Sequence, residues 1–241
     1  MPPPVRLISN ALYGLLTLLF VVTLAWAAVA SMNYGYGFWH DHGGLAENIE
    51  EYGPLNRHRK HFEDTDRQQR ISLFAEIVEA VHHGGEGLRE IRYQAPGQDY
   101  PTALLHRAEI IHLQDVSQLI RLAKSTLAAA SGLWLLLTAG ALWRKWPLPT
   151  VQQQLYGVVL GSLCMAAALL AFGFERVFYQ FHIWLFPPEH QWFFYYQESL
   201  MSTMMKAPVL FKYIGVSIGI LATPLFVGIA VAMKKISRSG L

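Results

Sequence analysis

The stretch "ISNALYGLLTLLFVVTLAWAAVA" at Ile8–Ala30 decides the class of fold. It is apolar over the length that a helix needs to cross a bilayer, which is about 20 residues. Three further stretches are similarly apolar, at 126–143, 155–174 and 208–233. The stretch at 126–143 is short, but a helix that continues into it from Ser117 would lengthen it. We therefore expect an all-α membrane protein with four transmembrane helices.

The composition supports this class and excludes others. Of the 241 residues, 53% are hydrophobic and only 15% are charged, whereas about 25% of the residues in a soluble domain are charged. The net charge is +2, and the chain has no long basic run of the kind that indicates a nucleic-acid partner. The single cysteine, Cys164, excludes an internal disulfide, and its place inside an apolar stretch favours a small core residue.

The first apolar stretch has a second interpretation. Its end, "WAAVAS" at Trp26–Ser31, offers the small residues of a signal-peptide cleavage site. However, the stretch is longer than the apolar core of a signal peptide, which is about 7–15 residues. We therefore interpret it as a retained membrane anchor, with a cleaved signal as the alternative.

The short segments that flank the spans indicate the orientation, because they carry basic residues and neither Asp nor Glu. These basic residues are Arg6, Arg144, Lys145, Lys234, Lys235 and Arg238. Short basic loops stay in the cytoplasm, so we expect both termini and the loop 144–150 there. Segments 31–125 and 175–207 then lie outside, since long loops cross the membrane largely regardless of their charge.

The outside segment 31–125 is expected to be mostly helical. From Arg70 to His83 the apolar residues recur on one face of a helix, and Gly84–Gly85 end it. A second helix begins near Thr102, and nothing breaks it before the second span. We therefore expect one integral membrane domain with a mostly helical extracytoplasmic part between spans 1 and 2.

The candidate chemistry lies on that second helix, in "AEIIHLQDV" at Ala108–Val116. On a helix, Glu109, His112 and Asp115 spread over about 120° of one side. A carboxylate one turn away can hold an imidazole in one tautomer and raise its basicity, as a general base requires. The alternative is an amphipathic interface helix whose polar face carries these residues, and the spacing alone favours that alternative.

A second histidine strengthens the interpretation as a reaction site. All ten histidines fall in the two outside segments. Two of them, His112 and His182, are expected near the outer membrane surface, where helix packing can bring them together. The sequence thus predicts a pair of interfacial imidazoles.

Aromatic residues are unusually dense around the second histidine. Residues 172–196 hold twelve of them, among them Phe181, Trp184 and Trp192. An ordinary membrane interface carries only a few Trp and Tyr. The density therefore favours a loop in the headgroup region that lines a groove for acyl chains, with a strong membrane anchor as an equal alternative.

Several spacings permit a metal site, but none is specific. Glu79 with His82, and Glu109 with His112, follow the Glu-x-x-His pattern of di-iron bundles, which need further carboxylates on their core helices. The four predicted spans contain none. The histidines at 40–61 offer ligands for zinc, yet solvated side chains explain them better. We expect neither a metal nor a cofactor.

Two motifs carry a resemblance to a known family. "AEIIHLQDV" resembles the Glu-x-x-His-Met-x-Asp-Val signature of the bacterial Lit-type lipoprotein intramolecular transacylases. "FHIWLFPPEHQW" at Phe181–Trp192, followed by "ESLMSTMMKAP" at 198–208, resembles the family's second block, which begins with Phe-His and ends in a Leu–Ile pair before a Pro. The family's four spans, its outside domain after the first span and its inward termini agree with the topology expected above.

The chain departs from the family at several positions. Leu113 stands at the Met of the signature, and Ser117 stands at the Lys that follows it. The family's Asp-Pro after the tryptophan is absent, and Glu198 is the acid that this segment offers instead. These departures bear on the substrate more than on the fold or the histidines.

The resemblance implies an acyl shift within one substrate, a lipoprotein whose N-terminal cysteine carries a diacylglyceryl group. The acyl chain at the sn-2 position would move to the α-amine of the cysteine, giving a lyso-form lipoprotein. His112 would act as general base, and His182 would protonate the leaving oxygen or stabilise the oxyanion. Glu109, Asp115 and Glu198 would support these two residues.

The substrate-binding residues implied by the resemblance are Phe181, Trp184 and Trp192, with Arg176 as a contact to lipid or backbone. The expected partners are lipoprotein N-termini and membrane lipids. The expected location is the bacterial inner membrane, with both termini cytoplasmic and the active site facing outward. Two rival functions stay open: a non-catalytic assembly or sensor protein of the same fold, and an outer-face lipid hydrolase.

Overall fold

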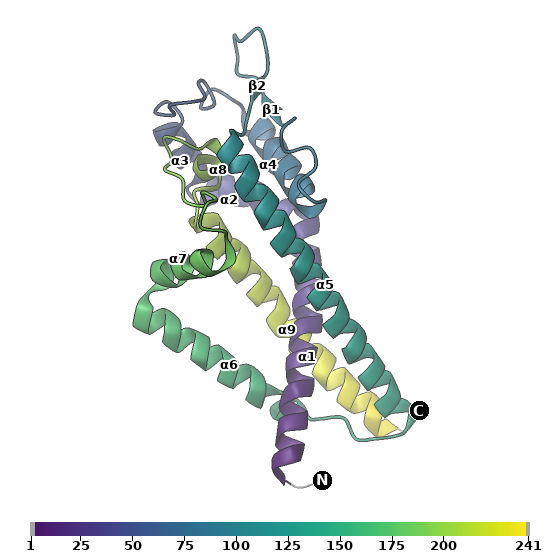
Figure 1. Ribbon diagram of the computed structural model, residues 1–241. Helices are drawn as coiled ribbons and strands as arrows, with labels where there is room; N and C mark the ends of the chain where they lie inside the picture. Colours follow the sequence, from purple (N-terminus) through teal and green to yellow (C-terminus); the bar gives the residue numbers. More distant parts are fainter. Residues whose placement is uncertain (1–2, 240–241) are drawn as a thin grey trace. The chain divides into compact units, whose positions relative to one another are not determined.

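The computed structural model describes residues 3–239, and these are mostly helical (Figure 1). The chain forms two compact units. Unit 1 comprises Met1–Ala28, Lys124–Phe181 and Ser217–Leu241, and unit 2 comprises Val29–Ala123 and His182–Val216. Each unit is therefore assembled from segments that are far apart in the sequence.

The elements follow one another in an order that is almost entirely helical. They are α1 (Pro3–Ser31), the 3-10 turn η1 (Asn33–Gly35), α2 (Tyr36–His42), α3 (Leu45–Tyr52), α4 (Arg67–His82), β1 (Arg92–Tyr93), β2 (Thr102–Ala103), α5 (Arg107–Trp143), α6 (Val151–Phe172), α7 (Phe174–Leu185), α8 (Leu200–Met205) and α9 (Val209–Ser239).

Three helices within the described residues are long and apolar enough to cross a membrane. They are Val5–Ser31 in α1, Arg107–Trp143, which is all of α5, and Val209–Ser237 in α9. α5 runs for 37 residues, so its polar first half lengthens the short apolar stretch as expected. These three helices are consistent with a multi-pass membrane protein.

The predicted span at 155–174 falls on α6, which has 22 residues and ends at Phe172. α6 is not among the three candidate spans of the described residues. Gly173 ends this helix with a φ of +78°, a left-handed conformation that favours glycine, and α7 begins immediately after it. A fourth transmembrane helix therefore stays a prediction.

Polar and apolar side chains both join the helices of unit 1. Trp134 of α5 donates from Nε1 to Thr17 Oγ1 of α1 at 2.9 Å, and the hydroxyls of Tyr13 and Thr138 lie 2.7 Å apart. Hydrogen bonds of this kind fix neighbouring helices where lipid offers no competing partner. An apolar cluster joins α1 to α9 and consists of Val21, Ala25, Ala222 and Phe226.

Helix α4 lies in unit 2 and confirms the predicted helix, although it begins three residues earlier. The Asp66 carboxylate caps it by accepting from Gln69 N at 2.7 Å. Tyr36 of α2 stacks on Phe74 of α4 with ring centroids 4.2 Å apart. The apolar side chains that α4 buries are Leu73, Phe74, Ile77, Ala80 and Val81.

A small hairpin precedes α5 and was not expected in an all-α fold. β1 and β2 pair antiparallel, with Arg92 opposite Ala103 and Tyr93 opposite Thr102. Two residues per strand are too few for the alternation that reveals a strand in a sequence. Arg59 holds the end of the hairpin, since its Nε donates to Ala103 O at 2.6 Å, and the start of α5 is thereby positioned.

Helix α8 is buried over its whole length inside unit 2. Its backbone carbonyls accept hydrogen bonds from two other helices, from Tyr36 OH to Met204 O at 2.9 Å and from Asn48 Nδ2 to Thr203 O at 2.8 Å. Burial raises the pKa of Tyr36, so its hydroxyl stays a donor at neutral pH. These hydrogen bonds hold α8 in place, and α8 thereby fixes the C-terminal end of the aromatic loop 186–199 that precedes it.

Candidate active site

The first half of α5 carries the "AEIIHLQDV" motif and lies in unit 2. The charged residues of this helix end at Lys124, and the residues from 125 to 143 are uncharged. The uncharged, apolar part of α5 therefore begins after Lys124. The motif lies in the charged part of the helix that precedes this apolar stretch.

His112 is buried in an aromatic environment, with only 9% of its surface exposed. Its ring centroid lies 4.9 Å from that of Phe186 and 5.9 Å from that of Phe194. Its Nδ1 atom is buried and has no hydrogen-bond partner among the described residues. A buried polar atom without a partner costs stability, so this nitrogen is a candidate contact for a substrate.

The environment of His112 also sets its protonation. Burial, followed by the neighbouring His182, lowers the pKa of His112 to about 4, against the opposing effect of the Asp115 carboxylate. The imidazole is therefore neutral at neutral pH. A neutral imidazole has a free lone pair on one nitrogen and can accept a proton.

His182 lies in the last turn of α7, and its ring faces that of His112. The two ring centroids are 6.5 Å apart with an angle of 28° between the planes. The ring of Trp192 lies 5.0 Å from His182, and the ring of Phe186 lies 5.2 Å from it. The structure thus brings together two histidines that are 70 residues apart in the sequence.

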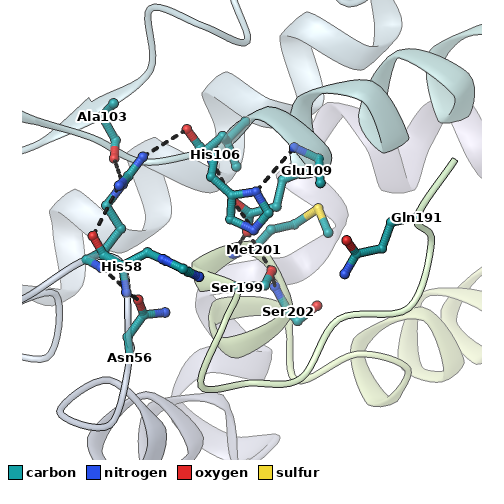
Figure 2. Close-up of polar contacts among 12 residues, drawn as sticks. Asn56, His58, Ala103, His106, Glu109, Gln191, Ser199, Met201 and Ser202 are labelled. Carbon is teal, nitrogen blue, oxygen red and sulfur yellow. Dashed lines mark hydrogen bonds and ion pairs between the residues drawn. The ribbon is translucent and has the colours of Figure 1, made fainter.

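Glu109 is fully buried and lies among hydrogen-bond donors, as Figure 2 shows. Its Oε1 accepts from Ser199 Oγ at 2.5 Å and from Met201 N at 3.1 Å, and its Oε2 accepts from His106 N at 2.6 Å. The bond from His106 N to the Glu109 carboxylate is one of the two hydrogen bonds of a capping box at the start of α5. Glu109 therefore joins the start of α5 to the start of α8, which is a structural role.

Asp115 contacts a third histidine, His190, which the sequence did not single out. His190 Nδ1 lies 2.7 Å from Asp115 Oδ2. The two residues are 75 positions apart, and no spacing rule connects positions so distant. The signal available was only that His190 falls inside the "FPPEHQW" block beside the aromatic residues.

Glu198 is partly exposed and forms an ion pair with Arg57. The Arg57 Nη1 to Glu198 Oε1 distance is 3.0 Å, and the Arg57 side chain is mostly exposed. Beside this pair, Arg57 N donates to Gln197 O at 2.8 Å. Glu198 thus helps to hold the aromatic loop at the surface.

The four predicted substrate-binding residues have different surroundings. Trp192 packs against His182 in unit 2. Trp184 also belongs to unit 2 and is 77% exposed. Phe181 and Arg176 are exposed residues of α7 that belong to unit 1. Phe186 and Phe194 are the rings that bury His112. In the sequence they stood out only as members of the dense group of aromatic residues.

An open pocket of about 440 Å³ adjoins the first turn of α5. It is lined by His58, Arg59, His106, Arg107, Ala108 and Ile111. The ring of Phe194 lies 5.8 Å from His106 and 5.9 Å from His112, so it contacts both the pocket lining and the buried imidazole. Figure 2 shows His58 and His106 on this side of the site.

One group of side chains within the described residues has the donor spacing of a metal site. His61, Glu63 and Asp64 place their ligand atoms within 4.8 Å of one another. Both His61 and Asp64 are exposed, and they form an ion pair at 3.1 Å. Solvated side chains with an opposite charge nearby account for this arrangement.

Comparison with known proteins bears on the region that holds the site. No curated protein and no solved structure matches the chain. The model of the family described as "Lipoprotein intramolecular transacylase Lit" matches residues 92–207, which is just under half of the chain. This region runs from β1 to the end of α8 and contains both His112 and His182. The resemblance predicted from the two motifs is confirmed by this match: the Lit family model covers residues 92–207, which contain both "AEIIHLQDV" and "FHIWLFPPEHQW".

Proposed function

We propose that this protein is an integral membrane acyltransferase acting on lipoproteins. It moves an acyl chain from the diacylglyceryl group of a lipoprotein to the α-amine of that protein's N-terminal cysteine, and a lyso-form lipoprotein results. The observation that carries the proposal is the buried, unpartnered Nδ1 of His112, which lies beside His182 inside the Lit-family region.

The reaction suits a site that is built around two imidazoles. The amine and the ester belong to the same substrate, so orientation supplies much of the rate enhancement. A C–N bond forms at the ester carbonyl, and the C–O bond to the glyceryl oxygen breaks. The proton that the amine loses ends on that oxygen, so the balance needs no co-reactant.

His112 is proposed as the general base of this reaction. Its neutral imidazole accepts a proton as the amine attacks the carbonyl carbon. The low pKa of His112 makes it a weak base at the start of the reaction. The negative charge that develops on the carbonyl oxygen then stabilises the imidazolium and raises its basicity when the proton is transferred.

His182 is proposed as the partner that completes proton transfer. With its ring centroid 6.5 Å from that of His112, it protonates the leaving glyceryl oxygen or stabilises the oxyanion. Trp192, Trp184 and Phe181 are proposed to contact the acyl chains, and Arg176 to contact lipid. Glu109, Asp115 and Glu198 support the site through their contacts with other parts of unit 2.

The proposed location follows from the charges of the short loops. The protein is proposed to lie in the bacterial inner membrane as a multi-pass protein with both termini in the cytoplasm and the site facing outward. Its partners are then diacylglyceryl-modified lipoprotein N-termini and the surrounding lipids. The three long apolar helices support the membrane assignment.

The test is mass spectrometry of lipoprotein N-termini in cells that lack other N-acylation. Expression of this protein should convert the diacyl form with a free amine into an N-acylated lyso form of the same mass, which fragmentation distinguishes. The His112→Ala and His182→Ala variants should abolish this conversion, whereas His58→Ala at the exposed pocket should not.

Three outcomes would refute parts of the proposal. An unchanged N-terminus on expression of the folded protein refutes the transacylase function, and loss of one acyl chain without N-acylation indicates the outer-face hydrolase instead. Activity that survives in the His112 variant removes His112 from the role of general base.

A further inference from the structure

The aromatic segment Phe186–Ser199 is attached to the rest of unit 2 at both of its ends. At the C-terminal end, Ser199 Oγ donates to the buried Glu109 carboxylate, and Gln197 O accepts from Arg57 N at 2.8 Å. Near the N-terminal end, His190 Nδ1 lies 2.7 Å from Asp115 Oδ2. The segment is therefore held against α5 from two sides.

The rings that surround the two candidate catalytic histidines lie between these attachments. Trp192 lies two residues after His190 and packs 5.0 Å from His182. Phe194 is buried and lies 5.9 Å from His112. A displacement of His190 therefore displaces the side chains that pack on both imidazoles.

Asp115 and His112 lie on the same helix, three residues apart. The rise of an α-helix places their Cα atoms about 4.5 Å apart along its axis. The attachment point of the aromatic segment is thus part of the rigid element that carries His112. The distance between His112 and the packed rings is then set locally, within one turn of helix.

The pair has the properties of a firm attachment. The Asp115 side chain is 14% exposed and that of His190 is 34% exposed, so water has limited access to the bond. A hydrogen bond to an ionised carboxylate is shorter and stronger than a neutral one. His190 N also donates to Pro187 O at 3.0 Å, which orders the backbone around it.

We infer that Asp115 and His190 are positioning residues, which hold the aromatic segment so that Trp192 and Phe194 keep the imidazoles of His112 and His182 in reacting geometry. The kinetic part of this inference rests on the proposed transacylase function. Neither residue of the pair transfers a proton: the hydrogen bond acts through the packed rings, and the Asp115 carboxylate in addition opposes the lowering of the His112 pKa. A misplacement of about 1 Å can lower a rate on the order of 100-fold.

Two variants test whether His190 acts as a hydrogen-bond donor or as a group that gains and loses a proton. In His190→Asn, the amide Nδ2 replaces the imidazole Nδ1 as donor to Asp115, and kcat should stay within about threefold of the original protein. In His190→Leu, kcat should fall on the order of 10- to 100-fold with little change in KM, because orientation is lost and lipid binding is retained. Asp64→Asn, at the exposed pair with His61, is the matched control and should leave both constants unchanged.

The exchange variant is the sharpest comparison. Asp115→His alone should be slow, whereas Asp115→His combined with His190→Asp restores a donor and an acceptor in reversed order. The double variant should recover at least part of the lost kcat. A merely structural effect of either substitution would add in the double variant and would not recover.

A second readout does not depend on transacylase activity. Diethyl pyrocarbonate modifies neutral imidazoles, and peptide mass spectrometry measures the modification of His112 separately. In folded protein, His190→Leu should speed the modification of His112 severalfold, whereas His190→Asn and Asp64→Asn should not. This measurement is compared at equal folded fraction, which thermal unfolding of each variant establishes.

The outcomes separate this inference from the proposed function. If the unaltered protein shows no transacylation, the proposed function fails, and the modification rates alone decide on the attachment. If the protein is active and His190→Leu matches it in kcat and in modification rate, the inference is overturned. If His190→Asn is as slow as His190→Leu, His190 acts in proton transfer, and the positioning role is also overturned.

Discussion

The phenyl ring of Phe194 packs against the imidazole of His112, with the two ring centroids 5.9 Å apart and a 56° angle between the planes. Only 6% of the Phe194 surface is exposed, so this contact belongs to the interior of unit 2. The burial of His112, the candidate base, therefore depends on the packing of the aromatic loop that precedes α8. Removal of the contact is expected to change both stability and reactivity.

Substitution of Phe194 by Ala should lower the free energy of unfolding by about 3 kcal/mol or more, because a large buried ring leaves a cavity. Thermal unfolding in detergent measures this loss. Phe194→Leu retains most of the volume and should lose less than half as much. Phe193→Ala, at an exposed neighbouring ring, is the control, and an equal loss there would contradict the packing argument.

The protonation of His112 predicts how stability depends on pH. Its pKa is about 4 in the folded protein, below the ordinary histidine value of 6.5, so the unfolded chain binds the proton more readily. The contribution of neutral His112 is therefore complete above pH 6.5 and is lost as the pH falls through about 4. Unfolding of the original protein and of His112→Gln, compared from pH 8 to pH 4, should show a difference that is constant above pH 6.5 and changes below it. A difference that does not change with pH would contradict the low pKa.

Glu109 should matter more for folding than for the chemical step. Glu109→Ala leaves three donors without an acceptor, two of them buried and the third part-buried, and should cost about 3 kcal/mol or more, since each buried unpaired donor costs about 1–3 kcal/mol. Glu198→Ala removes the partner of an exposed arginine and should cost less than about 1 kcal/mol. Chemical unfolding measures both values. The kcat of the folded fraction of Glu109→Gln should fall far less than that of His112→Ala, and an equal fall would assign Glu109 a direct part in catalysis.

The proposed orientation can be tested with single cysteines in intact cells. After replacement of Cys164 by Ala, a cysteine at Asp64 should react with a membrane-impermeant maleimide, whereas a cysteine at Lys145 should react only after the cells are permeabilised. Reaction of both positions before permeabilisation would contradict the cytoplasmic placement of the loop 144–150. Labelling is measured by the mass shift of the protein on a gel.

Much of the helical framework was predictable because it depends on local composition. The apolar stretches predicted α1 and α9, and the pattern after Thr102 predicted that one helix would run into the second span. α5 does so, but the predicted start was wrong, because Thr102–Ala103 form β2 and α5 begins at Arg107. The pairing of His112 with His182 was anticipated from their common place near the outer surface. Periodicity and membrane length are properties of short windows, so they can be read from one sequence.

The contacts of the carboxylates were not predictable, because their partners are far away in the sequence. Glu109 bonds with Ser199, 90 positions away, and Asp115 contacts His190. α8 was also missed, since its six residues are too few to show a 3.6-residue pattern and all of them are buried. These features depend on tertiary packing, which local patterns do not encode.

The bond between Glu109 and Ser199 has a consequence for how related sequences are interpreted. In "AEIIHLQDV", Glu109 joins α5 to the segment around Ser199 by a hydrogen bond, while His112, three residues later, faces His182. A relative that kept both Glu109 and Ser199 but replaced His112 would retain the architecture and lose the proposed reaction. Under the proposed function, His112 is therefore the residue of the motif that indicates activity, and Glu109 indicates only that the two segments still pack against each other.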